Sequence, residues 1–116
     1  GRTRLHGWDR RADTAMKKTY KFINRLINKI TLNGQPNNDS FSYYGHWVDL
    51  QSGTVDYVSV IIYNTSDRYS GTLMEFQFDF WTRELCFDVI SCDEVYDAVV
   101  KAFKSVYYNR HIRVIE

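Results

Sequence analysis

Proline, glycine and cysteine are all scarce in this sequence. One proline and six glycines among 116 residues exclude a collagen-like or low-complexity chain. Hydrophobic residues make up 44%, which is enough to bury the core of one domain. The two cysteines, Cys86 and Cys92, fit neither a zinc-binding spacing nor a redox Cys-x-x-Cys motif. We therefore expect two reduced, half-buried thiols.

The chain also lacks long hydrophobic segments and a strong net charge. No stretch approaches the roughly 20 apolar residues of a membrane helix, and no segment has the charged and apolar regions of a secretory signal. We expect a cytoplasmic protein without a membrane partner. The formal net charge of +1 indicates no attraction of the whole chain to nucleic acid.

Residues 1–15 differ from the rest of the chain. They contain four arginines and two aspartates without apolar periodicity, and Met16 followed by two lysines is typical of a translation start. We predict that residues 1–15 are an expression scar or a disordered arm and that residues 16–116 form a single domain. A native basic arm is the alternative. Without residues 1–15, the net charge changes from +1 to −1.

Apolar periodicity predicts a helix at each end of the domain. From Met16 to Leu32, apolar residues recur at the three- and four-residue spacing of an amphipathic helix, which Asn33-Gly34 then ends. Ser91 to Glu94 fits an S-x-x-E capping box for a second helix that ends near Asn109.

Four segments between the helices have the composition of β-strands. The fold class we predict is α+β, an antiparallel four-stranded meander in the order α-β-β-β-β-α, because short connections leave no room for parallel crossovers. Both helices pack on one face of the sheet, and His111 to Glu116 is a candidate short fifth edge strand. The four predicted strands are Phe41 to Leu50, Thr54 to Tyr63, Thr72 to Phe80 and Arg83 to Ile90.

Two registers are open for the last hairpin. A two-residue loop pairs Phe78 with Leu85 but sets acidic residues opposite one another at two positions, which destabilises a sheet. A four-residue loop pairs Phe80 with Leu85 and avoids both like-charge pairs. We predict the four-residue loop.

The first hairpin has an aromatic face. Pairing about Ser52 places its aliphatic residues on the core side and leaves four or five aromatic residues around the small pair Gly45 and Ser59 as a shallow concavity. Exposed aromatic surface of this kind is typical of interfaces. The alternatives are that the N-terminal segment, the loop of residues 64–71 or a second subunit covers it.

The leading hypothesis is a small non-enzymatic protein-binding module of the inhibitor, immunity or adaptor type. Its partner has a basic surface, because acidic side chains share the sheet face with the aromatic residues. The alternative partner is a second copy of the chain, which would bury this face in a homodimer. The Lys, Asn, Ile and Tyr content of Met16 to Leu32 is typical of an AT-rich genome and indicates a bacterial, phage or mobile-element source. The candidate partner-binding residues are Tyr43, Trp47, Tyr57, Tyr63, Glu75 and Asp79.

The alternative hypothesis is nucleic-acid binding through the first helix. Lys17, Lys21, Arg25 and Lys29 recur at i+4 spacing and form a basic stripe that can follow phosphates. A solvated helix face has the same pattern, and the sequence places no aromatic stacking partners within the stripe.

Residues that carry catalytic chemistry are few. The three histidines are far apart in the sequence, and no glycine-rich phosphate loop or G-x-S-x-G motif is present. Glu75, Asp79 and Asp88 as a Mg²⁺ site, or His46 with Tyr44 as an acid/base pair, are the weaker enzymatic alternatives. We expect no enzyme activity, no cofactor and no bound metal.

Overall fold

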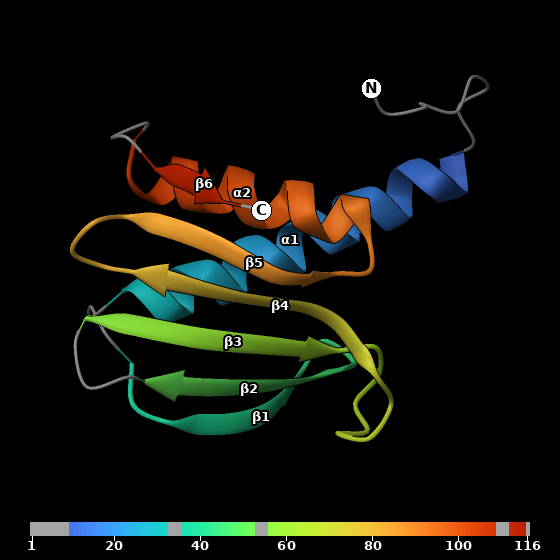
Figure 1. The fold of residues 1–116 in the computed structure, drawn as a ribbon. Helices are drawn as coiled ribbons and strands as arrows, with labels where there is room; N and C mark the ends of the chain where they lie inside the picture. Colours follow the sequence, from blue (N-terminus) through green and yellow to red (C-terminus); the bar gives the residue numbers. More distant parts are fainter. Residues whose placement is uncertain (1–9, 33–35, 53–55, 109–111, 116) are drawn as a thin grey trace.

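A computed structural model describes residues 10–32, 36–52, 56–108 and 112–115, with side chains from Lys18 onward. Within these residues the chain forms two helices and six strands (Figure 1). In chain order they are α1 (Arg10–Thr31), β1 (Asp39–Tyr43), β2 (His46–Ser52), β3 (Tyr57–Tyr63), β4 (Thr72–Asp79), β5 (Glu84–Ile90), α2 (Asp93–Val106) and β6 (Arg113–Ile115).

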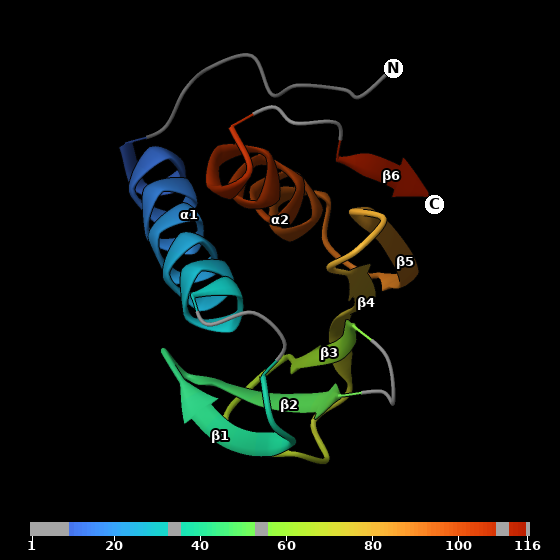
Figure 2. The same cartoon turned by 90° about the vertical axis from the view of Figure 1, so that its left-hand side faces the viewer.

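The fold is α+β with two layers. Both helices lie on the same side of a single twisted sheet, as expected (Figure 2). The strands follow one another in the order β1 to β6, and neighbours are antiparallel except for β6, which runs parallel to β5. The prediction of a four-stranded antiparallel meander was therefore wrong in strand number and in direction at one edge. The candidate edge strand forms, and α2 itself supplies the crossover that a parallel pair requires.

The predicted strand Phe41 to Leu50 is two strands joined by a tight turn. Tyr44 and Gly45 have φ angles of 51° and 80°, and positive φ at both central residues is typical of a two-residue hairpin turn. The prediction failed because tyrosine is not a common turn residue and the aromatic and β-branched pattern continues through the turn.

The hairpin of β2 and β3 turns later than predicted. Ser52 still pairs with Val58, so pairing is not centred on Ser52, and residues 53–55 lie outside the described residues. The shift is an even number of residues, so the aliphatic side chains of both strands still face the helices.

The hairpin of β4 and β5 adopts the register that the charge argument rejected. Phe78 lies opposite Leu85, and the predicted pairing of Phe80 with Leu85 was wrong. Residues 80–83 nevertheless form a four-residue connection, in which the Arg83 N–H donates to the Asp79 carbonyl at 2.8 Å.

Near this turn the acidic side chains have other partners. Asp79 Oδ1 accepts hydrogen bonds from the backbone N–H groups of Trp81 and Thr82 at 2.8 and 2.9 Å. Glu84 lies 3.6 Å from the guanidinium of Arg113 on β6. These contacts offset the repulsion that the sequence argument assigned to this register.

Further along the hairpin, a β-bulge separates the second acidic pair. The register shifts between Glu75 and Phe76, so that Glu75 opposes Val89 and not Asp88. Asp88 instead accepts a weak hydrogen bond from Gln77 Nε2 at 3.4 Å. A regular strand pairing could not predict this extra residue.

The boundaries of both helices differ from the prediction. α1 begins at Arg10 rather than Met16, so residues 10–15 of the predicted leader are helical, in keeping with the helix propensity of Arg and Ala. Residues 1–9 lie outside the described residues. α2 ends at Val106, before the predicted end near Asn109, which is also outside them.

The predicted capping box of α2 does not form. Cys92 occupies the N-cap position and makes no side-chain cap hydrogen bond. The Ser91 hydroxyl donates to the Thr72 carbonyl at 3.0 Å and therefore joins the helix start to β4.

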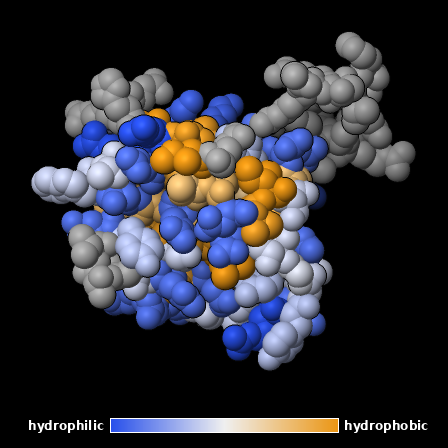
Figure 3. Space-filling view, in the orientation of Figure 1, coloured by the Kyte–Doolittle hydropathy of each residue, from blue (hydrophilic) through white to orange (hydrophobic). Residues whose placement is uncertain are grey.

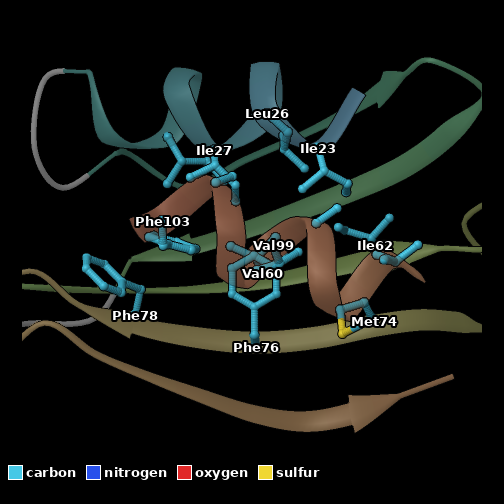
Figure 4. Close-up of a cluster of buried hydrophobic side chains, with 14 of the residues drawn as sticks. Ile23, Leu26, Ile27, Val60, Ile62, Met74, Phe76, Phe78, Val99 and Phe103 are labelled. Carbon is cyan, nitrogen blue, oxygen red and sulfur yellow. The ribbon is translucent and has the colours of Figure 1, made fainter. Parts of the chain in front are cut away.

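The core lies between the helices and the inner face of the sheet (Figure 4). Phe78 stacks on Phe103 at 4.4 Å between ring centroids, and Phe76 meets Phe103 edge-on at 5.9 Å. All three rings are fully buried, and no polar or charged side chain is buried in the described part of the chain. Other fully buried side chains include Ile23, Leu26, Ile27, Val60, Ile62, Met74 and Val99.

Neither described helix is long and apolar enough to cross a membrane.

Candidate functional site on the open sheet face

The helices leave one face of the sheet uncovered in the described part of the chain (Figure 2). Figure 3 looks onto this open face over β4 and β5 and shows hydrophobic patches among hydrophilic side chains. Strand alternation and the observed registers define its central residues. They are Trp47, Asp49, Tyr57, Ser59, Ile61, Tyr63, Glu75, Gln77, Asp79, Glu84, Cys86 and Asp88.

Four residues at one end of this face form a hydrogen-bonded group, which we call the Asp49 cluster: Ser40, Trp47, Asp49 and Tyr63. Asp49 Oδ1 accepts hydrogen bonds from Ser40 Oγ at 2.7 Å and from Trp47 Nε1 at 2.9 Å. Asp49 Oδ2 accepts one from the Tyr63 hydroxyl at 3.0 Å. One carboxylate on β2 therefore orients polar groups from three adjacent strands.

The contacts within the cluster shift the pKa values of Asp49 and Tyr63. Partial burial by itself raises the pKa of Asp49, but the hydrogen bonds from Ser40, Tyr63 and Trp47 and the positive charge of Arg68 outweigh it, so the pKa lies below its ordinary value. Burial and the neighbouring Asp49 carboxylate raise the pKa of Tyr63. At neutral pH the cluster therefore holds one negative charge and a protonated tyrosine.

Asp49 was not among the residues predicted from the sequence. The signal was available, because Trp47 and Asp49 are two residues apart on one strand and must share a face. The position of Tyr63 was not available, because the predicted hairpin places Tyr63 opposite Phe41, whereas in the observed register Asp49 lies opposite Ile61 and next to Tyr63.

Tyr57 lies at the other end of β3. It is opposite Asp79 on β4, and its side chain is 38% exposed. The six residue steps from Tyr57 to Tyr63 span about 20 Å of extended strand. The structure therefore brings Trp47 and Tyr63 together and places Tyr57 at a second, separate position.

Tyr43 does not belong to the open face. Because the chain reverses at Tyr44 and Gly45, Tyr43 lies opposite His46 and packs toward α1, with its ring 5.9 Å from that of Phe22. The prediction that Tyr43 shares the aromatic face with Trp47 was wrong. Gly45 lies in the turn, so the predicted pair of small residues, and the concavity around it, does not form.

The loop of residues 64–71 lies beside the Trp47 end of the open face. Of the backbone hydrogen bonds in the described part of the chain, one joins this loop to the face. Trp47 N–H donates to the Thr65 carbonyl at 2.8 Å. Within the loop, the side chains of Asp67 and Ser70 accept backbone N–H groups, and Tyr69 is 85% exposed. The loop therefore borders the Asp49 cluster and leaves Tyr57 exposed.

The two predicted acidic residues, Glu75 and Asp79, both lie on the open face. Their surroundings differ from each other. Glu75 is half-buried opposite Ile61 in the middle of the sheet. Asp79 is bound to the N–H groups of the following turn. Together with Asp49, Glu84 and Asp88, they give this face five carboxylates.

The basic stripe lies on α1, away from the open face. Lys21, Arg25 and Lys29 are exposed, and the side chain of Lys17 lies outside those described. Contrary to the sequence argument, aromatic rings do lie beside the stripe: Arg25 is 5.7 Å from the ring centroid of Tyr44, and Lys29 is 5.6 Å from that of Phe41.

Neither enzymatic alternative is assembled in the structure. The described residues contain no group of three or more His, Cys, Asp or Glu side chains placed to hold a metal ion, so the acidic residues do not converge on one. His46 Nδ1 lies 2.8 Å from the Tyr63 carbonyl, and its ring stacks on Phe22 at 4.9 Å. Tyr44 instead accepts a hydrogen bond from Arg25. The His46 ring is therefore a packing element.

The two cysteines are free and half-buried, as predicted. Cys86 lies on the open face opposite Gln77, and Cys92 is the N-cap residue of α2.

Comparison of the chain with protein-family models, with curated proteins and with solved structures finds no match.

Proposed function

We propose that this protein is a small protein-binding module whose open sheet face docks a partner with a basic surface. The observation that carries the proposal is the Asp49 cluster, which holds the Trp47 and Tyr63 side chains in a fixed orientation on a face that the helices leave uncovered. An inhibitor, immunity or adaptor protein needs a surface of this kind.

Preorganisation supports the aromatic part of this surface. Tryptophan and tyrosine are enriched among the residues that contribute most to protein interfaces. Their binding costs less when their rotamers are fixed beforehand, and the hydrogen bonds to Asp49 fix two of them. Tyr57, 38% exposed at the far end of β3, offers a second anchor.

Charge supports the basic character of the partner. The open face has five carboxylates, whereas Arg113 at its edge is paired with Glu84 and Arg68 lies in the bordering loop. Complementary charge steers association and disfavours partners of the same sign. An acidic protein or a nucleic acid is therefore a poor occupant of this face.

The test is affinity capture from a bacterial lysate with the full chain immobilised, with and without nuclease. Three variants accompany the native chain: Trp47→Ala/Tyr57→Ala on the open face, Glu75→Lys on the same face, and Tyr108→Ala as a control. The control removes an aromatic ring that is 84% exposed and follows α2, outside the open face. Circular dichroism melting shows whether each variant is folded, and Tyr57→Ala alone replaces the double variant if that one unfolds.

The proposal predicts that the native chain and the control retain one basic protein in stoichiometric amount after nuclease treatment, and that both open-face variants lose it. Retention by the open-face variants would place the interface elsewhere. Size-exclusion chromatography that shows a homodimer, broken by Tyr57→Ala, would mean that a second copy occupies this face instead.

A further inference from the structure

A second charged surface lies on the edge of the molecule where α1 meets the β1–β2 hairpin. Lys18, Lys21, Arg25 and Lys29 are exposed along α1. Residues 14–38 contain no aspartate or glutamate, so the part of α1 that carries this row, from Thr14 to Thr31, has no acidic side chain. The positive charge is therefore concentrated on a surface distinct from the acidic open face.

The hairpin adds an exposed aromatic ring to this row. Tyr44 is 55% exposed, and its hydroxyl accepts a hydrogen bond from Arg25. Its ring also packs against Phe22 at 6.0 Å and edge-on against Tyr43 at 4.7 Å. Three contacts from two elements thus hold the ring beside the cations while much of it faces solvent.

The turn places Tyr44 there at a conformational cost. Its φ of 51° is in the left-handed region, which residues other than glycine seldom adopt and which costs about 1 to 2 kcal/mol. Glycine or asparagine would form the same turn with less strain. The fold thus holds an aromatic side chain at this position although the turn geometry disfavours it.

We infer that this basic and aromatic edge, formed by Lys21, Arg25, Lys29 and Tyr44, binds single-stranded nucleic acid. Side chains at i, i+4 and i+8 rise about 6 Å per step along a helix, which suits successive phosphates of an extended strand. An exposed ring beside such a row provides a surface on which a base can stack. The acidic open face repels the phosphate backbone and confines it to this edge.

Single strands fit this edge better than a duplex does. A base stacks on Tyr44 only if it is unpaired, because the bases of a duplex already stack on one another. The sugar is not distinguished by these contacts, so the inference covers both single-stranded DNA and single-stranded RNA. The ligand class and its surface are independent of the protein-binding proposal for the open face.

The test is fluorescence anisotropy of the full chain with labelled oligo(dT) and oligo(U) of about 12 nucleotides, within the range that single-strand binding modules cover, and with a duplex of the same length. Three phosphate contacts predict a plot of log affinity against log salt with a slope of about −2 for the single strands. We expect saturable binding to both single strands and at least fivefold weaker binding to the duplex.

Two variants separate the phosphate contacts from stacking. Lys21→Glu/Lys29→Glu should weaken binding more than tenfold and bring the slope to about −0.7, the value for one remaining contact. Tyr44→Ala should weaken binding about fivefold or more without changing the slope, since base stacking is insensitive to salt. Tyr44→Phe, which keeps the ring, should retain most of the affinity.

A charge-matched control decides whether the effect is local. Lys101→Glu/Lys104→Glu changes the net charge equally at two exposed lysines of α2, and it should leave binding within about twofold of the native chain if the contacts are those of α1. Equal weakening by this control, unchanged binding in Tyr44→Ala, or no saturable binding at low salt would each overturn the inference. Melting curves confirm that the variants remain folded.

Discussion

Replacing Asp49 with alanine should destabilise the protein at neutral pH, because it removes the common acceptor of three hydrogen bonds. Ser40, Trp47 and Tyr63 all donate to this carboxylate, at 2.7, 2.9 and 3.0 Å. Hydrogen bonds to a charged acceptor contribute about 1.5 to 3 kcal/mol each when buried. These groups are only partly buried, and the freed donors can bond to water, so we expect a total loss of about 1 to 2 kcal/mol.

The loss should depend on pH in a defined direction. The pKa of Asp49 in the folded protein lies below its ordinary value of 3.8. Its contribution to stability is therefore fully present above about pH 5 and is lost as the pH falls through the ordinary value and then the lower folded value. The stability difference between the native chain and Asp49→Ala should be constant from pH 7 to about pH 5 and shrink in more acidic solution.

Urea denaturation followed by far-ultraviolet circular dichroism measures this difference without using Trp47 as the reporter. A double-mutant cycle of Asp49→Ala with Tyr63→Phe isolates one of the bonds, and we expect a coupling of about 0.5 kcal/mol or more. A destabilisation at pH 7 below about 0.3 kcal/mol, together with no coupling, would show that the carboxylate does not hold the aromatic side chains.

Three further substitutions test the account of the fold. Phe78→Ala should cost about 3 to 5 kcal/mol in urea denaturation, because the fully buried ring stacks on Phe103 at 4.4 Å; a cost below about 1.5 kcal/mol would contradict the described core. Gly45→Ala should cost about 1 to 2 kcal/mol from its φ of 80° alone, since no atom lies within 4 Å of the added Cβ. Cys92→Ser should raise the free energy of unfolding by about 0.5 to 1 kcal/mol, and with it the melting temperature, because serine supplies the missing N-cap hydroxyl of α2. A lower melting temperature would contradict that assignment.

The parts of the fold that the sequence predicts are those with strong local periodicity. The alternation through Met74, Phe76 and Phe78 is reproduced in β4, with all three buried. The helical spacing predicted both helices and the face that each of them buries, since Ile23 and Val99 are fully buried. In these segments the burial of apolar side chains determines the structure, and the pattern of burial is visible in the sequence.

The errors arise where tertiary contacts override a local rule. The turn at Tyr44 is occupied by a residue with low turn propensity, whose ring is held by α1. The β4–β5 register places hydrophobic side chains in contact, and its acidic side chains find partners in a turn and in a strand of distant sequence, Arg113. The parallel edge was not predicted, because the connections between the predicted strands are short and the long crossover that it needs is α2 itself.

The candidate site was predicted in part for the same reasons. Strand alternation put Trp47, Tyr57 and Tyr63 on one face, and the observed registers keep them there. Tyr43 lies on the other face, because the chain reverses direction at the turn that follows it. Asp49, the residue that joins the cluster, carries no signal by itself and gains its role only from the donors that three strands bring to it.

The central claim is that the open face is the docking surface for a basic protein. It is tested most directly by the dissociation constant of the full chain for the protein retained in the capture experiment, measured by isothermal titration calorimetry. For Trp47→Ala/Tyr57→Ala we predict an increase of about thirtyfold or more, the effect of losing an interface hot spot of about 2 kcal/mol, while Tyr108→Ala remains at the native value. A dissociation constant of the open-face variant within about twofold of the native value would contradict the claim.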